Sequence, residues 1–435
     1  MYTSERTFTN HAAACARRPV ALAVDIRTPT NYYYFFPTDP RKDNPTLANT
    51  YADDVAFLSR YTQVLELAAG TAKVAVAPAY QGRVMTSTLA GSDGASFGWL
   101  NARFIVAGAE DVHFNNYGGE DRFWLGPESG QFGLFHAAGE PFDVAHWKTP
   151  PAFNTGDFQV AKAAKNAVTM TRQMDVTNYA GTTFRCGVHR TVSIISPPAA
   201  GKLLGTPIPS AVKMVGFESC NTLTNTGQKP WTKAGGLVSI WILGQFKPLP
   251  RGKVIVPFKA GPDRKLGPKA TTNYFGQLPP ERCRVAEDHL LLTCDGRYRS
   301  KIGVSPHRAK NLLGSFDPDS GVLTVVQFSL PRNAGKRPYV NSLWEMQKKP
   351  FTGDAVNSYN DGEAAPGAGQ LGPFYELETS SPAAELTKGR AITHSHRTFH
   401  FSGPAEAIDA LAQKLLGVAL TEIGEPLPEL DRSEM

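Results

Sequence analysis

The chain has 435 residues, of which 41% are hydrophobic and 10% aromatic, so it is long enough to bury a substantial core. Its net charge of +6 is modest for this length and comes without an RNA- or DNA-binding signature, which argues against a nucleic-acid partner. No apolar run of about 18 residues occurs, so no membrane span is predicted.

Residues 1–50 are polar and punctuated by proline, and they show no sustained periodicity. We therefore expect an N-terminal extension over 1–50, one large domain over 51–423 and a tail over 424–435. No convincing signal peptide precedes Cys15, because the apolar core of such a leader is missing. The sequence leaves the compartment of a soluble protein open between cytoplasm and periplasm.

The main domain is predicted to be all-β, because glycine and proline recur between short runs rich in Val, Ile, Phe and Tyr. Residues 62–89 contain three apolar runs separated by turn residues and predict an antiparallel meander. Further strands are predicted at 142–147, 167–176, 184–195, 211–225, 236–246, 252–258, 289–296, 300–304, 321–330, 374–379 and 391–401.

Two segments have helical patterns, a short one at 52–59 and a longer one at 405–416. The second has Ser402 as a candidate N-cap and Gly417 as a stop. Its apolar residues fall on one stripe and should pack on a sheet. They are Ile408, Leu411, Leu415 and Leu416.

Segment 118–132 (GGEDRFWLGPESGQF) is expected to form a shaped loop, because its Gly-Gly and Gly-Pro pairs interrupt regular structure. Carboxylates and arginine hydrogen-bond sugar hydroxyls, and a tryptophan offers a flat face to a pyranose ring. The candidate binding residues are Glu120, Asp121, Arg122, Trp124 and Glu128. The alternative is an arginine–carboxylate pair that only braces a turn.

Alternate residues of a strand share one face, so Glu376 and Glu378 should point the same way. The same holds for the histidines at 394, 396 and 400. His394 and His396 are close enough in an extended chain to share a divalent metal with one of these glutamates. They could equally act as general acids against a glutamate base, or hydrogen-bond to structural partners.

Two further segments carry planar, polar or cationic groups. Asn360 lies in the glycine-rich stretch 353–372, which is expected to line a cleft, and Trp344 precedes it, although Asn-Asp-Gly is also an ordinary turn sequence. Arg299 alternates with Arg297 and Lys301 in a part of the chain where basic residues outnumber acidic ones. This pattern favours either a solvated surface or an acidic glycan.

Segment 374–401 (FYELETSSPAAELTKGRAITHSHRTFHF) resembles the C-terminal part of aldose 1-epimerases of the galactose mutarotase-like superfamily, and Glu378 matches their catalytic glutamate. The Gly-Gly-x-x-Arg-x-Trp-x-x-Pro-Glu pattern of segment 118–132 resembles an early segment of those proteins. From about Tyr51 the chain is similar to an uncharacterised bacterial family of the superfamily. The shared motifs are GGEDRFWLGPE, SIWILG, DGRYRSKIG, NSYNDG and YELETS.

This resemblance implies a β-supersandwich with a short C-terminal helix and a concave sheet that holds a sugar. It implies that Glu378 deprotonates the anomeric hydroxyl while a histidine protonates the ring oxygen. The family's central histidine motif is missing from 221–231, so His113, His394 or His396 would take that role.

Whether the protein is an enzyme is left open by the sequence. The first hypothesis is an aldose epimerase-like isomerase that acts on a mono- or oligosaccharide, with His394 and His396 as acid or metal ligands. The second is a lyase or other processing enzyme for acidic glycans, and the third is a non-catalytic glycan-binding protein. Glu376 and His113 complete the set of candidate sugar-binding residues.

Overall fold

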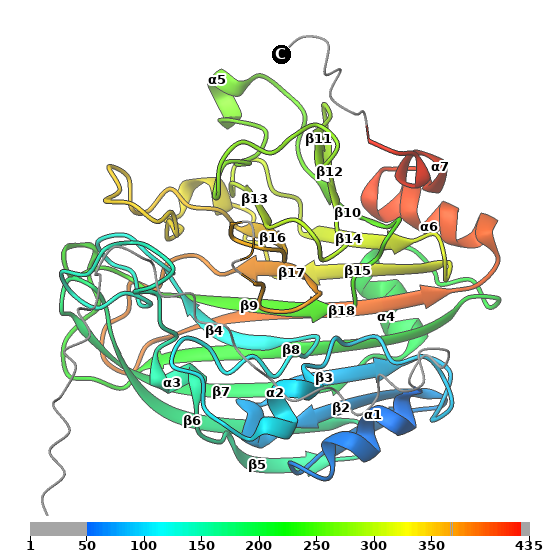
Figure 1. Ribbon diagram of the computed structural model, residues 1–435, viewed down its shortest axis with the longest axis horizontal. Coiled ribbons are helices and arrows are strands. Elements are labelled where there is room, and N and C mark those ends of the chain that lie inside the picture. Colours follow the sequence, from blue (N-terminus) through cyan, green and yellow to red (C-terminus); the bar gives the residue numbers. More distant parts are fainter. Residues whose placement is uncertain (1–49, 366, 368, 428–435) are drawn as a thin grey trace, which may run out of the picture. The chain divides into compact units, whose positions relative to one another are not determined.

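The computed structural model describes residues 50–427 except 366 and 368, and these residues form three antiparallel sheets (Figure 1). The predicted N-terminal extension and most of the predicted tail lie outside the described residues. The predicted all-β class is confirmed, since large antiparallel sheets dominate.

The first sheet is the predicted meander, with β1 (Leu65–Ala69), β2 (Ala72–Ala77) and β3 (Arg83–Thr88) in sequential order. Helix α1 (Tyr51–Leu58) precedes it and begins at Thr50, whose hydroxyl accepts from the Asp53 amide while the Asp53 carboxylate accepts from the Thr50 amide. This reciprocal capping box stabilises a helix of only eight residues.

The second sheet has ten antiparallel strands and includes most of the long strands predicted from sequence. In spatial order they are β11 (Cys283–Val285), β12 (His289–Thr293), β10 (Lys253–Pro257), β14 (Leu312–Asp317), β15 (Val322–Phe328), β18 (Ala391–Ser402), β8 (Lys213–Asn225), β7 (Thr183–Ile194), β6 (Ala167–Thr177) and β5 (Gln159–Ala164). The apolar stripe of α6 (Ala405–Leu416) packs on one face of this sheet, against β14 and β10, and belongs to the same apolar cluster as Phe399 and Phe401 of β18. Figure 1 shows α6 beside β10 and β14.

The third sheet has five strands and carries several polar residues of the candidate site. Its spatial order is β13 (Ser300–Val304), β16 (Val356–Asn360), β17 (Tyr375–Ser380), β9 (Ser239–Phe246) and β4 (Arg122–Gly126). One face packs against the ten-stranded sheet, because Thr379 of β17 hydrogen-bonds to His394 and His396 of β18. The pleat therefore directs Glu376 and Glu378 to the opposite face.

The remaining helices are short. They are α2 (Ala102–Ala107), α3 (Pro151–Asn154), α4 (Pro197–Leu204), α5 (Asp263–Leu266), α7 (Leu420–Gly424) and the 3₁₀ turns Pro78–Tyr80, Lys233–Gly235 and Ala334–Lys336. No helix among the described residues is long and apolar enough to cross a membrane.

Several predicted local features were wrong. Segment 118–132 contains β4, because its glycine pairs flank the short strand instead of interrupting it. Residues 142–147 form turns, and the stretch 353–372 includes β16. Helix α6 has Pro404 as its N-cap, without a side-chain hydrogen bond, in place of Ser402.

Candidate functional site

Glu378 lies at the centre of the polar face of the five-stranded sheet and is fully buried. The Trp241 indole N–H donates to Glu378 Oε2 over 2.9 Å, and the Lys301 ammonium lies 3.7 Å from the same oxygen. Glu378 Oε1 has no hydrogen-bond partner although it is buried. One oxygen of this carboxylate is therefore held in place, while the other is a buried acceptor without a protein donor.

Burial raises the pKa of Glu378 to about 7, because water no longer solvates its charged form. The nearby ammonium of Lys301 opposes this shift, and the neighbouring carboxylate of Glu376 adds to it. A carboxylate with a pKa near neutrality is suited to both taking up and releasing a proton at physiological pH.

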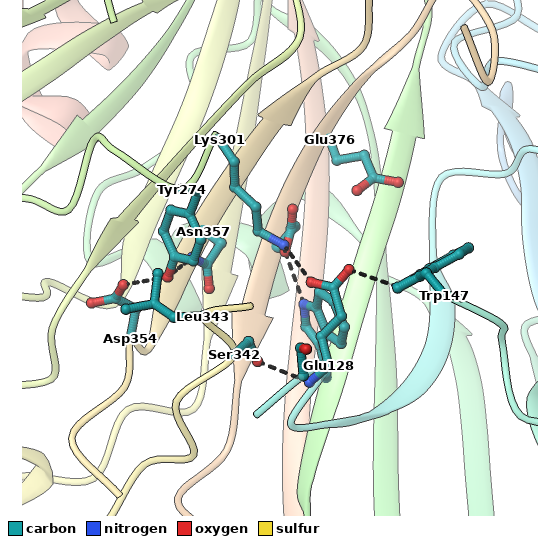
Figure 2. Close-up of polar contacts among 12 residues, drawn as sticks. Glu128, Trp147, Tyr274, Lys301, Ser342, Leu343, Asp354, Asn357 and Glu376 are labelled. Carbon is teal, nitrogen blue, oxygen red and sulfur yellow. Dashed lines mark hydrogen bonds and ion pairs between the residues drawn. The ribbon is translucent and has the colours of Figure 1, made fainter. Parts of the chain in front are cut away.

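Lys301 joins Glu378 to a second carboxylate, that of Glu128, whose Oε2 lies 3.4 Å from the ammonium. Burial lowers the pKa of Lys301, but the carboxylates of Glu378, Glu128 and Glu376 outweigh that effect and raise it above its usual value. Figure 2 shows Lys301 and Trp147 both directed at Glu128, and the Trp147 indole N–H donates to Glu128 Oε1 over 3.1 Å. Lys301 thus donates a hydrogen bond to Glu128 and forms an ion pair with Glu378.

A small cavity beside this cluster is lined by Lys301 and Trp241. Its other polar lining residues include Tyr274, Asp354 and Asn357. Tyr274 donates to Asp354 over 2.6 Å, and the Asn357 amide donates to the Tyr274 oxygen over 3.1 Å (Figure 2). Burial raises the pKa of Asp354 to about 6. The cavity volume of about 10 Å³ is roughly that needed for one water molecule.

Two segments beside this cavity are hydrogen-bonded to each other. The Glu128 amide donates to the Ser342 hydroxyl over 3.1 Å, and Gln131 and Gln347 exchange side-chain to backbone hydrogen bonds of 2.8 and 2.9 Å. These hydrogen bonds join the residues around 128–131 to those around 342–347, next to the cavity that Ser342 lines together with Lys301 and Trp241.

Arg122 lies on the same face, in β4, and donates to Glu376 Oε1 over 3.1 Å. Its guanidinium carbon lies 3.9 Å from the Trp124 ring centroid and 4.8 Å from that of Phe114. Arg122 Nε and Nη1 are buried without hydrogen-bond partners. Burial raises the pKa of Glu376, against the opposing effect of Arg122.

Glu120 and Asp121 do not join this face, contrary to the sequence expectation. Asp121 forms a fully buried ion pair with Arg190 at 2.5 Å and accepts a hydrogen bond from Ser219. Glu120 pairs with His400 at 2.8 Å. Both acids therefore pair with buried residues of the ten-stranded sheet, Asp121 with Arg190 of β7 and Glu120 with His400 of β18.

His394 and His396 also lie away from Glu378. Both rings contact the Thr379 hydroxyl, at 2.8 and 2.9 Å, on the side of β17 that faces the ten-stranded sheet. Glu378 points to the other side, so the histidines cannot act on the same substrate atoms. The sequence expectation that one of them is the acid partner of Glu378 receives no support from this placement, because periodicity indicates which residues share a face but not which residues that face contacts.

The metal hypothesis for His394 and His396 lacks the required geometry. It depends on Glu376 or Glu378 as a further ligand, and the sheet separates those carboxylates from both imidazoles. Within the described part of the chain, no three His, Cys, Asp or Glu side chains converge in a way that could hold a metal ion.

Burial lowers the pKa of His394 to about 3 and that of His396 to about 4. Both imidazoles are therefore expected to stay neutral between pH 5 and 8, since that whole range lies above their pKa values. Their ring signals in NMR spectra should not shift over this range in the folded protein. The same protein unfolded in urea is the control, and there the rings should titrate near pH 6.5. A transition between pH 5 and 8 in the folded state would contradict this expectation.

Two other predicted binding residues have structural contacts. Asn360 is fully buried and its amide donates to the Tyr298 carbonyl while its oxygen accepts from the Gly296 amide. His113 lies 2.6 Å from the Trp147 carbonyl through Nδ1. His113 therefore reaches the cluster around Glu378 only through the backbone of Trp147, and the hydrogen bonds of Asn360 go to other residues.

Arg299 and Trp344, by contrast, come together on the same side of the sheet as Lys301. Arg299 immediately precedes β13 and its guanidinium carbon lies 3.7 Å from the Phe275 ring centroid and 5.9 Å from that of Trp344. All three side chains are half-buried. They form what we call the Arg299 cluster, defined as Arg299, Phe275 and Trp344.

Sequence reasoning missed Trp241, Trp147, Tyr274 and Asp354 as members of this site and treated Lys301 only as part of a cationic ladder. The alternation of Arg297, Arg299 and Lys301 was a usable signal for Lys301, because it shares a face with Arg299. No local pattern marks Asp354 or Tyr274, which come from separate loops.

The model of a family of unknown function, DUF6786, matches residues 49–427, and the chain belongs to this family. A comparison with curated proteins gave no match. The predicted resemblance to an uncharacterised family is thereby confirmed.

Several solved structures are similar to this one. A candidate aldose 1-epimerase from Escherichia coli K12 is 11% identical, with a TM-score of 0.45, over 79% of this chain and 100% of the other. A galactose mutarotase-like protein from Lactobacillus casei is 13% identical, with a TM-score of 0.43, over 78% of this chain and 100% of the other. The Slr1438 protein from Synechocystis is 10% identical, with a TM-score of 0.46, over 79% of this chain and 96% of the other.

Proposed function

We propose that the protein is a carbohydrate-active enzyme that interconverts the two anomers of a sugar, with Glu378 as the base and Lys301 as the acid. The observation that carries this proposal is a fully buried carboxylate with a pKa of about 7, one unpartnered oxygen and an ammonium 3.7 Å away. The resemblance of segment 374–401 to aldose 1-epimerases supports the role of Glu378.

The reaction needs one proton taken up and one released at neighbouring oxygens. Glu378 removes the proton of the anomeric hydroxyl, a carbonyl forms at C1, and the bond between C1 and the ring oxygen breaks. The ring oxygen takes a proton from the Lys301 ammonium. Ring closure on the other face of the carbonyl returns both protons and gives the other anomer.

Lys301 is placed to do what the resemblance assigns to a histidine. The two oxygens that exchange protons are bonded to the same carbon, so the acid and the base have to lie close together, as Lys301 and Glu378 do. Both groups are shielded from water, which strengthens their interaction with charge that develops during the reaction. Trp241, which donates to Glu378, supports the orientation of the base.

The proposal is tested by measuring anomer interconversion by saturation-transfer NMR on a panel of neutral and acidic hexoses, with heat-denatured protein as the blank. We expect transfer between the two anomeric signals well above the spontaneous rate for at least one sugar. No acceleration for any sugar of the panel would contradict the proposal.

The rate should depend on pH through Glu378. The base works only when ionised, and its pKa is raised to about 7, so the rate should be low at pH 5 and rise through pH 7 to a plateau. The raised pKa of Lys301 keeps the acid protonated across this range. A rate that is already maximal at pH 5 would contradict the assignment of Glu378 as the base.

The two alternatives receive less support from the geometry. A lyase built on histidines and arginines beside Glu378 lacks the histidines, which contact Thr379 on the other face of β17. A non-catalytic glycan-binding protein has no need of a base and an acid in contact. It would bind a sugar in the assay above without exchanging its anomers.

A further inference from the structure

We propose that the sugar processed at Glu378 carries a carboxylate, and that the Arg299 cluster binds this group. The substrate class is then a hexuronic acid, either free or at the end of a chain. This inference rests on the proposed function for the location of the reacting carbon, but it concerns a separate set of residues.

The first support is that the Arg299 guanidinium forms no ion pair with a described carboxylate, since the nearby Asp361 accepts hydrogen bonds from Tyr359 and the Gly372 amide and affects Arg299 only through its charge. Among residues 50–427 as far as they are described, none forms an ion pair with it, and its neighbours are the rings of Phe275 and Trp344. Other arginines of the molecule are paired, since Arg122 contacts Glu376 and Arg282 contacts Asp295. A half-buried guanidinium between aromatic rings is therefore left with its hydrogen-bond donors available.

The second support is position. Arg299 and Lys301 are alternate residues of one extended segment, which places them on the same face and roughly 6 to 7 Å apart along the chain. This separation suits a hexopyranose, whose carboxyl carbon is attached to the ring on the far side of the ring oxygen from C1. With C1 at Glu378 and Lys301, the carboxylate would point toward Arg299.

The third support is chemical complementarity. A planar guanidinium binds a carboxylate through two parallel hydrogen bonds, and the rings of Phe275 and Trp344 can pack against the apolar face of a sugar. A single arginine balances the single charge of a carboxylate. A phosphate carries more charge and would call for further cations, which the Arg299 cluster does not contain.

The electrostatics of the site explain why such an arginine is needed. Glu128, Glu376 and Glu378 lie on the sheet face that the sugar would meet, and Lys301 and Arg122 are engaged with them. An anionic sugar would be repelled by these carboxylates without a cation of its own. Arg299 supplies that cation, and it would also select against neutral sugars.

The test compares the binding of glucuronate, galacturonate, glucose, galactose and glucose 6-phosphate by isothermal titration calorimetry. The proteins are the full-length wild type, Arg299→Gln, Arg299→Lys and the matched control Arg297→Gln, whose arginine lies two residues away and is exposed. We expect the wild type to bind a uronate about 10-fold or more tighter than the matching neutral sugar, as for hydrogen bonds to a charged group. Arg299→Gln should lose this preference, Arg299→Lys should keep part of it, and Arg297→Gln should keep all of it.

Binding separates this inference from the proposed function. A uronate preference that depends on Arg299, without anomer exchange, would support carboxylate binding by the Arg299 cluster and reject the enzymatic proposal. Anomer exchange on neutral sugars without any uronate preference would support the enzymatic proposal and reject carboxylate binding by the Arg299 cluster. Preference for glucose 6-phosphate, or equal binding of all sugars, would overturn the carboxylate assignment, and so would unchanged uronate binding in a folded Arg299→Gln protein.

Discussion

Replacing Glu378 with glutamine is expected to lower the rate of anomer interconversion by about 10²- to 10⁴-fold, which is the usual contribution of a general base. Glutamine has nearly the same shape and can still accept the hydrogen bond from Trp241, but it cannot take up a proton from the sugar. Lys301 keeps Glu128 as a charged partner, so the site should stay assembled. Saturation-transfer NMR at pH 8 measures the effect.

The matched control is Glu385→Gln, which makes the same chemical change at an exposed position and should leave the rate unaltered. Sugar binding and thermal unfolding of Glu378→Gln should be measured alongside the rate. A folded variant that binds sugar and retains more than about a tenth of the wild-type rate would contradict the role of Glu378 as the base.

Replacing Arg190 with methionine is expected to lower the free energy of unfolding by about 3–5 kcal/mol, because it leaves the buried Asp121 carboxylate without its cation. Arg190 is fully buried and also donates to Asn221 over 2.6 Å and to the Gly82 carbonyl over 2.9 Å. Urea unfolding followed by tryptophan fluorescence measures the change.

The same strand supplies the control for this experiment. Arg185 of β7 also faces an aspartate, Asp175, but at 3.7 Å and with both side chains exposed. Arg185→Met should therefore cost no more than about 1 kcal/mol. Equal effects of the two substitutions would show that burial does not govern the strength of the Arg190–Asp121 pair, contrary to this prediction.

Much of the fold could be predicted because strand and helix periodicities are local. The meander, the strands around β17 and β18, and the helix from Ala405 to Leu416 all follow from side chains two or three to four residues apart. The same reasoning correctly grouped Glu376 with Glu378, and His394 with His396, on shared faces. The alternation of side chains between the two faces of a strand is a property of the extended backbone. It can be predicted without knowing which strands pair with it.

The composition of the site was harder to predict because its pairs are remote in sequence. Arg122 meets Glu376, and Lys301 meets Glu128, across more than 170 residues in each case. A single sequence contains no signal for such pairings. The mistaken joining of the histidines to Glu378 has the same origin, since which sheet face becomes interior depends on the packing of distant strands.

The alternation along β17 has a consequence for how this protein can change. The side chains of Leu377 and Thr379 face the interior, while those of Glu376 and Glu378 face the candidate site. Substitutions at the even-numbered positions could thus alter the chemistry while the packing stays intact. Loss or gain of a single residue in this strand would instead exchange the two sets and bury acids against histidines. The strand should therefore tolerate substitutions at these positions but not insertions or deletions.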